Sequence, residues 1–304
     1  MSADAVVSSL MSQAEVVVGC DINPAAWLPA AQNLSHFYQV PLATDSGYIG
    51  AIADICVTEK ITHLIPLTDP EVDVLSLQRE RLHALGVVLC APPVDSVFRC
   101  RDKWLLHEFL KNEFSVIPSL ELKDWPLWRG SFPLLAKPRC GRSRIGHFRL
   151  LNARDADYVV DAVTVPYIVQ PLLSGSIFAV DVVRNRLSGK CVSVAREELI
   201  RTSNGAGLTV KMAPSSPVNS IAKKICDFLD INGCVNMEFL VSQKEFLLMD
   251  VNPRFSAGVA FSKAAGYDMA RNHLRCFTGH EIEDDVCYTD LIIAKNFQEI
   301  NLMI

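Results

Sequence analysis

Short apolar runs alternate with amphipathic stretches over the first hundred residues of the chain. Two of the runs, "AEVVVGCDINP" and "ITHLIPLTD", lead into the acids Asp21 and Asp69, and a third, "VVLCAPP", follows. The segments between them, around residues 48–60 and 71–86, space their apolar residues as a helix does, and so does the opening "ADAVVSSLMSQ". Apolar runs that are rich in β-branched residues and alternate with helices are typical of a parallel sheet covered by helices. We therefore predict a small α/β domain over residues 1–98.

The order of elements at the start of this domain is unusual. A doubly wound unit normally opens with a strand and a glycine-rich turn, whereas this sequence opens with the helical segment. Either a first strand is missing or the fold forms without one, and the sequence leaves both explanations open.

A different pattern begins near Asp102, which is placed to cap the amphipathic helix "DKWLLHEFLKNEF". Beyond it, short apolar segments come in pairs joined by polar or glycine-containing turns, which is typical of antiparallel strands. We predict such pairs at residues 132–151, 176–197 and 234–254, a helix at 220–233, and further helices after residue 258. This part of the chain is therefore expected to be α+β.

The composition is that of a soluble globular protein, with 50% apolar and 21% charged residues and a net charge of −5. This charge gives no general reason to bind nucleic acid or an anionic membrane, although a local basic pocket remains open. The ten cysteines are scattered, and no two of them form a Cys-x-x-Cys pair. The apolar runs are too short to span a membrane. These features predict a reducing, cytoplasmic location.

Candidate chemistry is concentrated in "FLLMDVNPRFSAG", where an apolar strand ends at Asp250, Asn252 and Arg254. Side chains alternate along a strand, so the acid and the amide point the same way. Two oxygen ligands with a cation just beyond them suit a hard metal ion that carries phosphates. A strand that simply stops at a polar turn is the alternative.

Glu238 and Asp250 flank one tight turn and should lie on adjacent antiparallel strands. If they share a face, the two carboxylates repel each other unless a cation lies between them. Magnesium is the natural candidate, because it takes carboxylates, phosphate oxygens and waters together. Two surface acids on opposite faces remain the alternative.

A third candidate is "LLAKPRCGRSRIG", in which Lys137 ends an apolar strand and a loop with Arg139, Gly141 and Ser143 follows. Backbone N–H groups in such a loop can converge on an anion, because glycine permits unusual dihedral angles. The loop lacks both the P-loop and the dinucleotide-binding motif. A solvated basic hairpin without a function is the alternative.

Taken in order, Lys103, Lys137, the glycine-containing loop, Glu238 and "DVNPR" resemble the ATP-grasp superfamily, and in particular its branch similar to the carbamoyl-phosphate synthase large subunit. The resemblance extends over nearly the whole chain through "VGCDINP", "LIPLTDPEVDVL" and "SKAAGYDMARNHLRCFTG". It implies a Rossmann-like pre-ATP-grasp α/β domain over residues 1–98, followed by an α+β ATP-grasp domain. That domain would consist of a mobile lid subdomain at 99–175 and a core subdomain at 176–304.

The resemblance also implies roles for residues that match the family's motifs. It implies ATP and Mg2+ or Mn2+ as ligands, and the matching positions fall into three groups. Lys103, Lys137, Arg139, Gly141 and Ser143 match the phosphate end, Gln170, Pro171 and Leu172 match the hinge whose backbone recognises adenine, and Glu238, Asp250 and Asn252 match the metal ligands. Arg254 matches the arginine that steadies the transferred phosphoryl group.

The sequence departs from the family pattern at three places. The family usually has glutamate where this chain has Asp250, which is one methylene shorter. The hinge reads "QPLLSGSI", so Pro171 and Ile177 stand where carboxylates are common near the nucleotide ribose. The absent first strand is the third departure. The hinge changes put the strength of ATP binding and the choice of nucleotide in doubt.

The resemblance implies a ligase in which a carboxylate attacks the γ-phosphate of ATP and an amine, or another nucleophile, displaces phosphate from the acyl phosphate. Arg196 and Arg201 are candidates for binding the carboxylate, since arginine binds it bidentately; ordinary surface arginines are the alternative. Related enzymes are often dimers, so a homodimer is expected. Two other classes stay open: a nucleotide-binding protein without catalysis, and a dehydrogenase built on the N-terminal domain.

Overall fold

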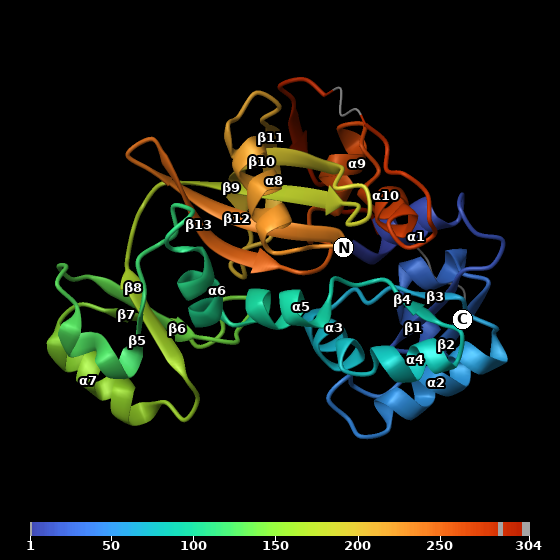
Figure 1. Ribbon diagram of the computed structural model, residues 1–304, viewed down its shortest axis with the longest axis horizontal. Coiled ribbons are helices and arrows are strands. Elements are labelled where there is room, and N and C mark those ends of the chain that lie inside the picture. The colour runs from blue at the N-terminus through green and yellow to red at the C-terminus, as the bar shows by residue number, and fades with distance from the viewer. Residues whose placement is uncertain (1, 285–287, 300–304) are drawn as a thin grey trace.

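The computed structural model describes residues 2–284 and 288–299 of the 304-residue chain, and three groups of elements make it up (Figure 1). An N-terminal group, coloured blue to cyan, lies at one end, and a small green sheet lies at the other. A six-stranded sheet, coloured yellow to red, lies above both of them. The predicted order of an α/β part followed by an α+β part with a separate small sheet is confirmed.

Two parallel pairs of short strands form the centre of the N-terminal group. β1 pairs with β2 and β3 pairs with β4. Leu75 and Leu82 of the surrounding helices are buried in one apolar cluster with Leu89 of β4. The elements are β1 (Val18–Asp21), β2 (His36–Gln39), α2 (Tyr48–Thr58), β3 (His63–Leu64), α3 (Asp69–Ser76), α4 (Arg79–Ala84) and β4 (Val88–Leu89), with 3₁₀ helices at Ala25–Trp27 and Pro29–Asn33. The predicted alternation of strands and helices is confirmed. The strand β2 was not predicted, because its sequence contains no apolar run.

The single helix predicted over residues 71–86 is two helices in the structure, α3 and α4. The break turns Arg79 toward the chain that leaves β4, where its guanidinium donates to the carbonyl oxygens of Leu89 and Ala91, both at 3.0 Å. Helical spacing of the apolar residues continues across the break, so periodicity alone did not reveal it.

A four-stranded antiparallel sheet, with strand order β5-β8-β6-β7, forms the small green unit and is here called the lid sheet. Its β6–β7 hairpin is the one predicted at residues 132–151. α5 and α6 connect the N-terminal group to it, and the domain boundary predicted after residue 98 falls inside α5. The elements are α5 (Val94–Arg101), α6 (Lys103–Leu110), β5 (Leu120–Glu121), a 3₁₀ helix (Leu122–Leu127), β6 (Leu134–Pro138), β7 (Phe148–Leu150), α7 (Ala153–Ala162) and β8 (Tyr167–Pro171).

The six-stranded sheet is antiparallel throughout and has the strand order β13-β12-β9-β10-β11-β14. Its hairpins β9–β10 and β12–β13 confirm the strand pairs predicted at residues 176–197 and 234–254. The elements are β9 (Ser176–Arg184), β10 (Cys191–Arg201), β11 (Gly207–Met212), α8 (Val218–Phe228), β12 (Gly233–Ser242), β13 (Glu245–Asn252), α9 (Val259–Ala264), α10 (Met269–Arg275) and β14 (Ile292–Ala294).

The two faces of this sheet bury different apolar clusters. Val180 and Val182 of β9 pack on one face with α8 and α6, whereas Val183 packs on the other face with α9 and α10. Successive side chains of a strand point to opposite faces, so β9 contributes to both clusters. The second face also carries the polar side chains of the candidate site.

The opening helix α1 (Ser2–Leu10) packs on α9 and α10 on this second face and also contacts the 3₁₀ helix Pro29–Asn33 of the N-terminal group (Figure 1). Val6 is buried in the same cluster as Phe255 and Val259, and Lys263 Nζ donates to the Ser9 hydroxyl at 2.8 Å. The sequence predicts the helix from its apolar face, but that face does not identify the core that it joins.

The described part of the chain contains free cysteines and short helices. All nine cysteines in the described part of the chain are free thiols. Across residues 2–284 and 288–299, no helix is both long enough and apolar enough to cross a membrane.

Candidate nucleotide and metal site

Glu238 and Asp250, here called the acid pair, are direct register partners on β12 and β13. Paired residues of an antiparallel sheet lie on the same face, so the two carboxylates face the same side. Next to this pair the register shifts by one residue. Phe239 is opposite Leu248, so Met249 is the extra residue of a β-bulge. The bulge turns Leu248 into the apolar core and leaves Asp250 on the face of Glu238. The prediction that the acids share a face is confirmed.

Two buried lysines lie beside the acid pair. Lys103 is the first residue of α6, and its Nζ lies 2.9 Å from the carbonyl oxygen of Gly141 and 3.7 Å from Asp250 Oδ2. Lys137 is on β6 and is 5% exposed. Its pKa is lowered to about 8, mainly by burial and also by the charge of Lys103, while the carboxylates of Asp250 and Glu238 oppose this shift. Two positive and two negative side chains therefore face one another across β6, α6 and the β12–β13 hairpin.

The loop between β6 and β7, residues 139–147, is here called the lid loop. Its tip is a tight turn with left-handed residues, since φ is 54° at Ser143, 61° at Arg144 and 73° at Gly146. Arg144 Nη1 donates to the Ser203 carbonyl at 3.5 Å. The lid loop therefore reaches across to the loop between β10 and β11 and covers the side of the site where Lys103 lies.

Arg139 is placed differently from the sequence expectation. Its guanidinium binds Asp102 bidentately, at 3.0 Å from Nε to Oδ1 and 2.6 Å from Nη2 to Oδ2, and it donates to Glu121 at 2.7 Å. Asp102 in turn caps α6 by accepting from the backbone N–H of Trp104. Arg139 therefore fixes the start of α6, the helix that carries Lys103, and a contact between Arg139 and phosphate stays a prediction.

The predicted hinge runs along the end of β8. Gln170 is 6% exposed and donates from Nε2 to the Ser119 hydroxyl at 2.7 Å. Pro171 has no N–H, and the N–H of Leu172 donates to the Pro133 carbonyl at 3.0 Å. Recognition of a base by the backbone of these last two residues would therefore use carbonyl oxygens.

A cavity of about 20 Å³ lies beside this hinge, with Lys103, Gln170 and Met249 among its walls. This volume is roughly that of one water molecule and is too small for a purine base.

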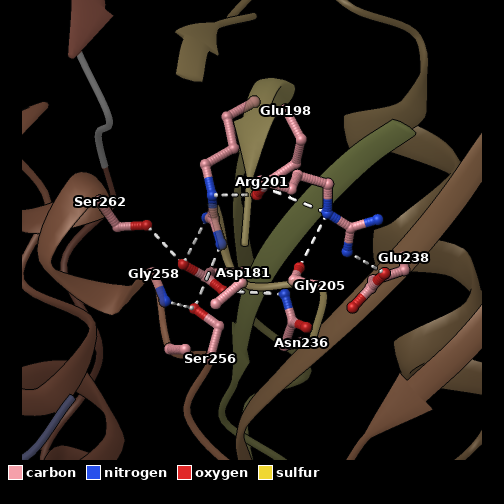
Figure 2. A network of polar contacts seen from close by, with 12 residues as sticks. Asp181, Glu198, Arg201, Gly205, Asn236, Glu238, Ser256, Gly258 and Ser262 are labelled. Atoms are coloured by element: carbon pink, nitrogen blue, oxygen red, sulfur yellow. Dashed lines mark hydrogen bonds and ion pairs between the residues drawn. The ribbon is translucent and has the colours of Figure 1, made fainter. Parts of the chain in front are cut away.

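Arg201 closes the site from the opposite side, at the end of β10 (Figure 2). Its Nη2 donates to Glu238 Oε2 at 2.8 Å, and its Nε donates to the Gly205 carbonyl at 2.8 Å. A second carboxylate, that of Glu198, lies 4.0 Å away. Arg201 therefore meets the acid pair, as a residue that borders the site should.

Arg196 does not reach the site. It is 1% exposed, and each of its three nitrogens donates to a protein oxygen. The partners are Glu198 Oε1 at 3.2 Å, Asp181 Oδ2 at 2.7 Å and Ser256 Oγ at 3.2 Å. Asp181 also accepts from Asn236 and Ser262, so the arginine is the centre of a buried polar network (Figure 2). All three nitrogens of Arg196 thus bind protein oxygens in this structure, and its role in binding a substrate carboxylate stays a prediction.

Arg254 follows the metal-site strand directly, and its backbone N–H donates to the Asn252 carbonyl at 2.8 Å. Its guanidinium binds Asp69 with two hydrogen bonds, of 2.6 Å from Nε and 2.9 Å from Nη2. Asp69 begins α3 in the N-terminal group and was not among the predicted site residues. The sequence did carry a signal for it, because the apolar run "ITHLIPLTD" ends at this acid.

Glu198 is a second residue of the site that the sequence analysis missed. Burial raises the pKa of its carboxyl, against the lowering effect of Arg196 and Arg201. It stands in a run of charged residues at the end of β10, and nothing in that run distinguishes a buried acid from an exposed one.

The donor set can be tested against a magnesium ion on chemistry alone. Among the described residues, no group of three or more His, Cys, Asp or Glu side chains could hold a metal. The acid pair and the Asn252 amide offer hard oxygen ligands on one face, and Asn252 is the register partner of Asn236. Magnesium commonly binds through one or two carboxylates and completes its shell with phosphates and waters, so these residues fit it.

Family models match both parts of the chain. Residues 164–299 match the model described as "ATP-grasp in the biosynthetic pathway with Ter operon", and residues 4–90 match "PylC-like, N-terminal domain". The first match contains β9 to β14 and the acid pair, and the second contains the N-terminal group.

Two similar curated proteins are both carbamoyl phosphate synthase large chains. The one from Thermoplasma acidophilum is 25% identical over 230 residues, which are 67% of this chain and 22% of that protein. The one from Caldanaerobacter subterraneus subsp. tengcongensis is 28% identical over 181 residues, or 54% of this chain and 16% of that protein. The matches thus span about a fifth of the length of these relatives.

Solved structures share the fold at low identity. The biotin carboxylase domain of the Hydrogenobacter thermophilus 2-oxoglutarate carboxylase has a TM-score of 0.78 and 16% identity, covering 92% of this chain and 68% of that one. The Staphylococcus aureus N5-carboxyaminoimidazole synthetase has a TM-score of 0.74 and 15% identity, covering 92% and 75%. The family models, the curated relatives and the shared fold agree with the resemblance seen in the sequence: residues 164–299 match an ATP-grasp model, and residues 4–90 match the N-terminal domain of PylC-like proteins.

Proposed function

We propose that the chain is an ATP-dependent ligase that joins a small carboxylate to an amine, or to a related nucleophile, through an acyl phosphate. The observation that carries this proposal is the facing arrangement of the acid pair and the two buried lysines, with Lys103 Nζ 3.7 Å from Asp250. Such a cluster of opposite charges suits a triphosphate that brings its own cation.

Each part of the site has a proposed role. Lys103, Lys137 and the lid loop, with Gly141 and Ser143, bind the phosphates, and the hinge at Gln170, Pro171 and Leu172 holds the adenine. Glu238, Asp250 and Asn252 hold Mg2+ or Mn2+, which when bound neutralises charge on the phosphate oxygens. Arg254 and Arg201 stand at the two sides of the acid pair, where the transferred phosphoryl group and the carboxylate would meet.

The chemistry needs positioning and charge neutralisation more than a reactive side chain. The substrate carboxylate oxygen forms a bond to the γ-phosphorus, and the bond from that phosphorus to the β,γ-bridging oxygen breaks, so that ADP leaves with the electron pair. The amine nitrogen then attacks the acyl carbon, the bond to the phosphate oxygen breaks, and the departing phosphate takes the proton that the amine loses. Arginine and lysine stabilise the charge on the oxygens in both steps.

Two structural neighbours support this choice of ligands. The Hydrogenobacter thermophilus domain was solved as a dimer in complex with MgADP, ADP and bicarbonate, an anion whose oxygens resemble those of a small carboxylate. The Staphylococcus aureus synthetase was also solved with ADP. We propose the same kinds of ligand for this chain, together with a homodimeric assembly and a cytoplasmic location.

A phosphate-release screen tests the proposal. Purified chain, Mg2+ and ATP are mixed with pools of amino acids, bicarbonate and other small carboxylates, with and without amines, beside the Glu238→Ala variant. We expect ADP and phosphate in equal amounts from one pool, and only background release from the variant. Formation of AMP instead of ADP would contradict an acyl-phosphate ligase.

A second candidate, a nucleotide-binding protein without catalysis, is favoured by two observations. The Arg201 guanidinium already donates to the Glu238 carboxylate at 2.8 Å. Pro171 also stands at a hinge position where the family commonly has a carboxylate. This candidate predicts that Mg2+-ATP binds with a measurable dissociation constant while no pool raises phosphate release above the level of Glu238→Ala.

A further inference from the structure

A single acid of the N-terminal group reaches into the candidate site. Asp69 is 3% exposed and binds the guanidinium of Arg254 through both carboxylate oxygens, at 2.6 and 2.9 Å. The two residues are 185 positions apart in the chain. Arg254 Nη1 also donates to the Phe255 carbonyl at 2.9 Å. The side chain is 20% exposed, in contrast to the enclosed Arg196, and each terminal nitrogen keeps a second N–H that can face a ligand.

The position of Asp69 is fixed by its own helix. It is the first residue of α3, directly after the N-cap Thr68, and a capping box joins Thr68 to Glu71. The Thr68 N–H donates to Glu71 Oε2 at 2.8 Å and the Leu67 N–H donates to the same oxygen at 3.1 Å. Reciprocal bonds of this kind hold the first turn of a helix in one conformation. The carboxylate that Arg254 meets is therefore held rigidly.

Two further cations face the same carboxylate. Arg101 of α5 lies 3.5 Å from Asp69 Oδ1, and it also binds Asp73 at 2.9 Å. Burial alone would raise the pKa of Asp69, but Arg254, Arg101 and Arg142 of the lid loop together hold it below its ordinary value. Asp69 thus remains ionised where the N-terminal group, the end of β13 and the lid loop come together.

We propose that Asp69 is a positioning residue that holds the Arg254 guanidinium against the phosphoryl end of the nucleotide, so that the N-terminal domain supplies part of the active site. A bidentate pair fixes both the place and the plane of a guanidinium, which a single hydrogen bond does not. The proposal rests on the proposed function, because it assigns Arg254 to the γ-phosphate.

Nucleotide binding tests this role without knowledge of the acceptor substrate. Titration calorimetry compares Mg2+-ADP with Mg2+-AMP-PNP, which carries a γ-phosphate and is not hydrolysed. We expect Asp69→Asn to weaken AMP-PNP about tenfold and to change ADP less than about twofold, since only the γ-phosphate would meet Arg254. A merely structural role would weaken both nucleotides alike, and equal losses would overturn the proposal.

Asp73→Asn is the matched control. Asp73 is on the same helix and binds the same Arg101, but its contact is with that arginine and its side chain is 35% exposed. The ratio of the two dissociation constants should stay at the wild-type value. Asp69→Glu keeps the negative charge and moves it by one methylene, so it provides a folded variant in case Asp69→Asn unfolds; it should shift the ratio in the same direction by about threefold.

A double-mutant cycle separates a direct effect from one that passes through Arg254. In the Arg254→Gln background, Asp69→Asn should add less than about twofold to the loss of AMP-PNP affinity, because the guanidinium it positions is gone. Additive losses would overturn the proposal. A wild-type chain that binds neither nucleotide would overturn the proposed function and this inference together, whereas normal wild-type binding with an unchanged ratio in Asp69→Asn would overturn the inference alone.

Discussion

Glu238 and Asp250 face each other because Met249 is an extra residue in β13. Without this bulge, Asp250 would lie on the same side as Leu248, which packs against Phe239 in the apolar core. One residue therefore decides whether the Asp250 carboxylate faces Glu238 or the core, and the proposed metal site depends on this bulge.

Loss of one carboxylate should be seen directly in metal binding. We expect Glu238→Gln to weaken Mn2+ binding, measured by electron paramagnetic resonance with ADP present, at least about tenfold, because one hard anionic ligand is removed. Glu245→Gln is the control, since Glu245 is at the other end of the same hairpin and binds the Ser115 hydroxyl. Equal effects of the two changes would show that the acid pair is not the metal site.

Arg201 competes with a cation for Glu238 in the described state. Replacing it with glutamine leaves the acid pair without its nearest positive charge, so Mn2+ binding to the nucleotide-free chain should strengthen about fivefold. Phosphate release should fall in the same variant, because Arg201 would no longer stabilise the transferred group. Arg186→Gln, an exposed arginine that pairs with Asp230, should change neither quantity. Weaker Mn2+ binding in Arg201→Gln would contradict this competition.

The lowered pKa of Lys137 predicts that nucleotide binding depends on pH. Its pKa is lowered to about 8 by burial, so it is protonated below this pH and increasingly neutral above it. Only the protonated form attracts phosphate, and the affinity for ADP should therefore fall as the pH rises from 7.5 to 9.5, by up to about tenfold per pH unit. Lys137→Arg should flatten the profile, because arginine stays charged over this range. A wild-type profile as flat as that of the variant would rule out this role.

The lid loop depends on a glycine at its end. Gly146 has φ of 73°, and a Cβ there would lie 2.7 Å from the Tyr167 hydroxyl. Gly189 has φ of 75°, but a Cβ there meets nothing within 4 Å. Gly189→Ala should cost about 1 kcal/mol in urea unfolding from backbone strain alone, and Gly146→Ala about 2 kcal/mol or more, with weaker ADP binding. Equal losses would mean that the loop shifts away from Tyr167 at no cost.

Replacing each of the two arginines of β10 should change the unfolding free energy by different amounts. Arg196→Ala leaves the buried Asp181 without its cation, and we expect a loss of about 3–5 kcal/mol in unfolding free energy. Arg201→Ala, at a partly exposed position, should cost much less and act mainly on phosphate release. Denaturant unfolding checks the first expectation. If the Arg196→Ala chain kept its stability but released less phosphate, Arg196 would instead act in the site.

The sequence was sufficient where the chemistry follows the strand pattern. The hairpin from Cys234 to Arg254 could be predicted from its apolar alternation and its polar turn, and with it the acid pair. Arg139, Arg196 and Asp69 could not be placed, because their roles depend on partners that are distant in the chain. An arginine in a strand or loop has the same sequence signature whether it faces a phosphate, a helix cap or a buried acid.

The opening helix α1 packs on α9 and α10, while the segment that follows it runs back to the N-terminal strands. The N-terminal group is therefore connected to the rest of the chain at both of its ends, through α1 and through α5, and not by a single linker. A chimera that replaces the PylC-like part with that of a relative must therefore keep the α1 of this chain. An exchange that also removed α1 would expose the apolar surface of α9 and α10 that α1 covers.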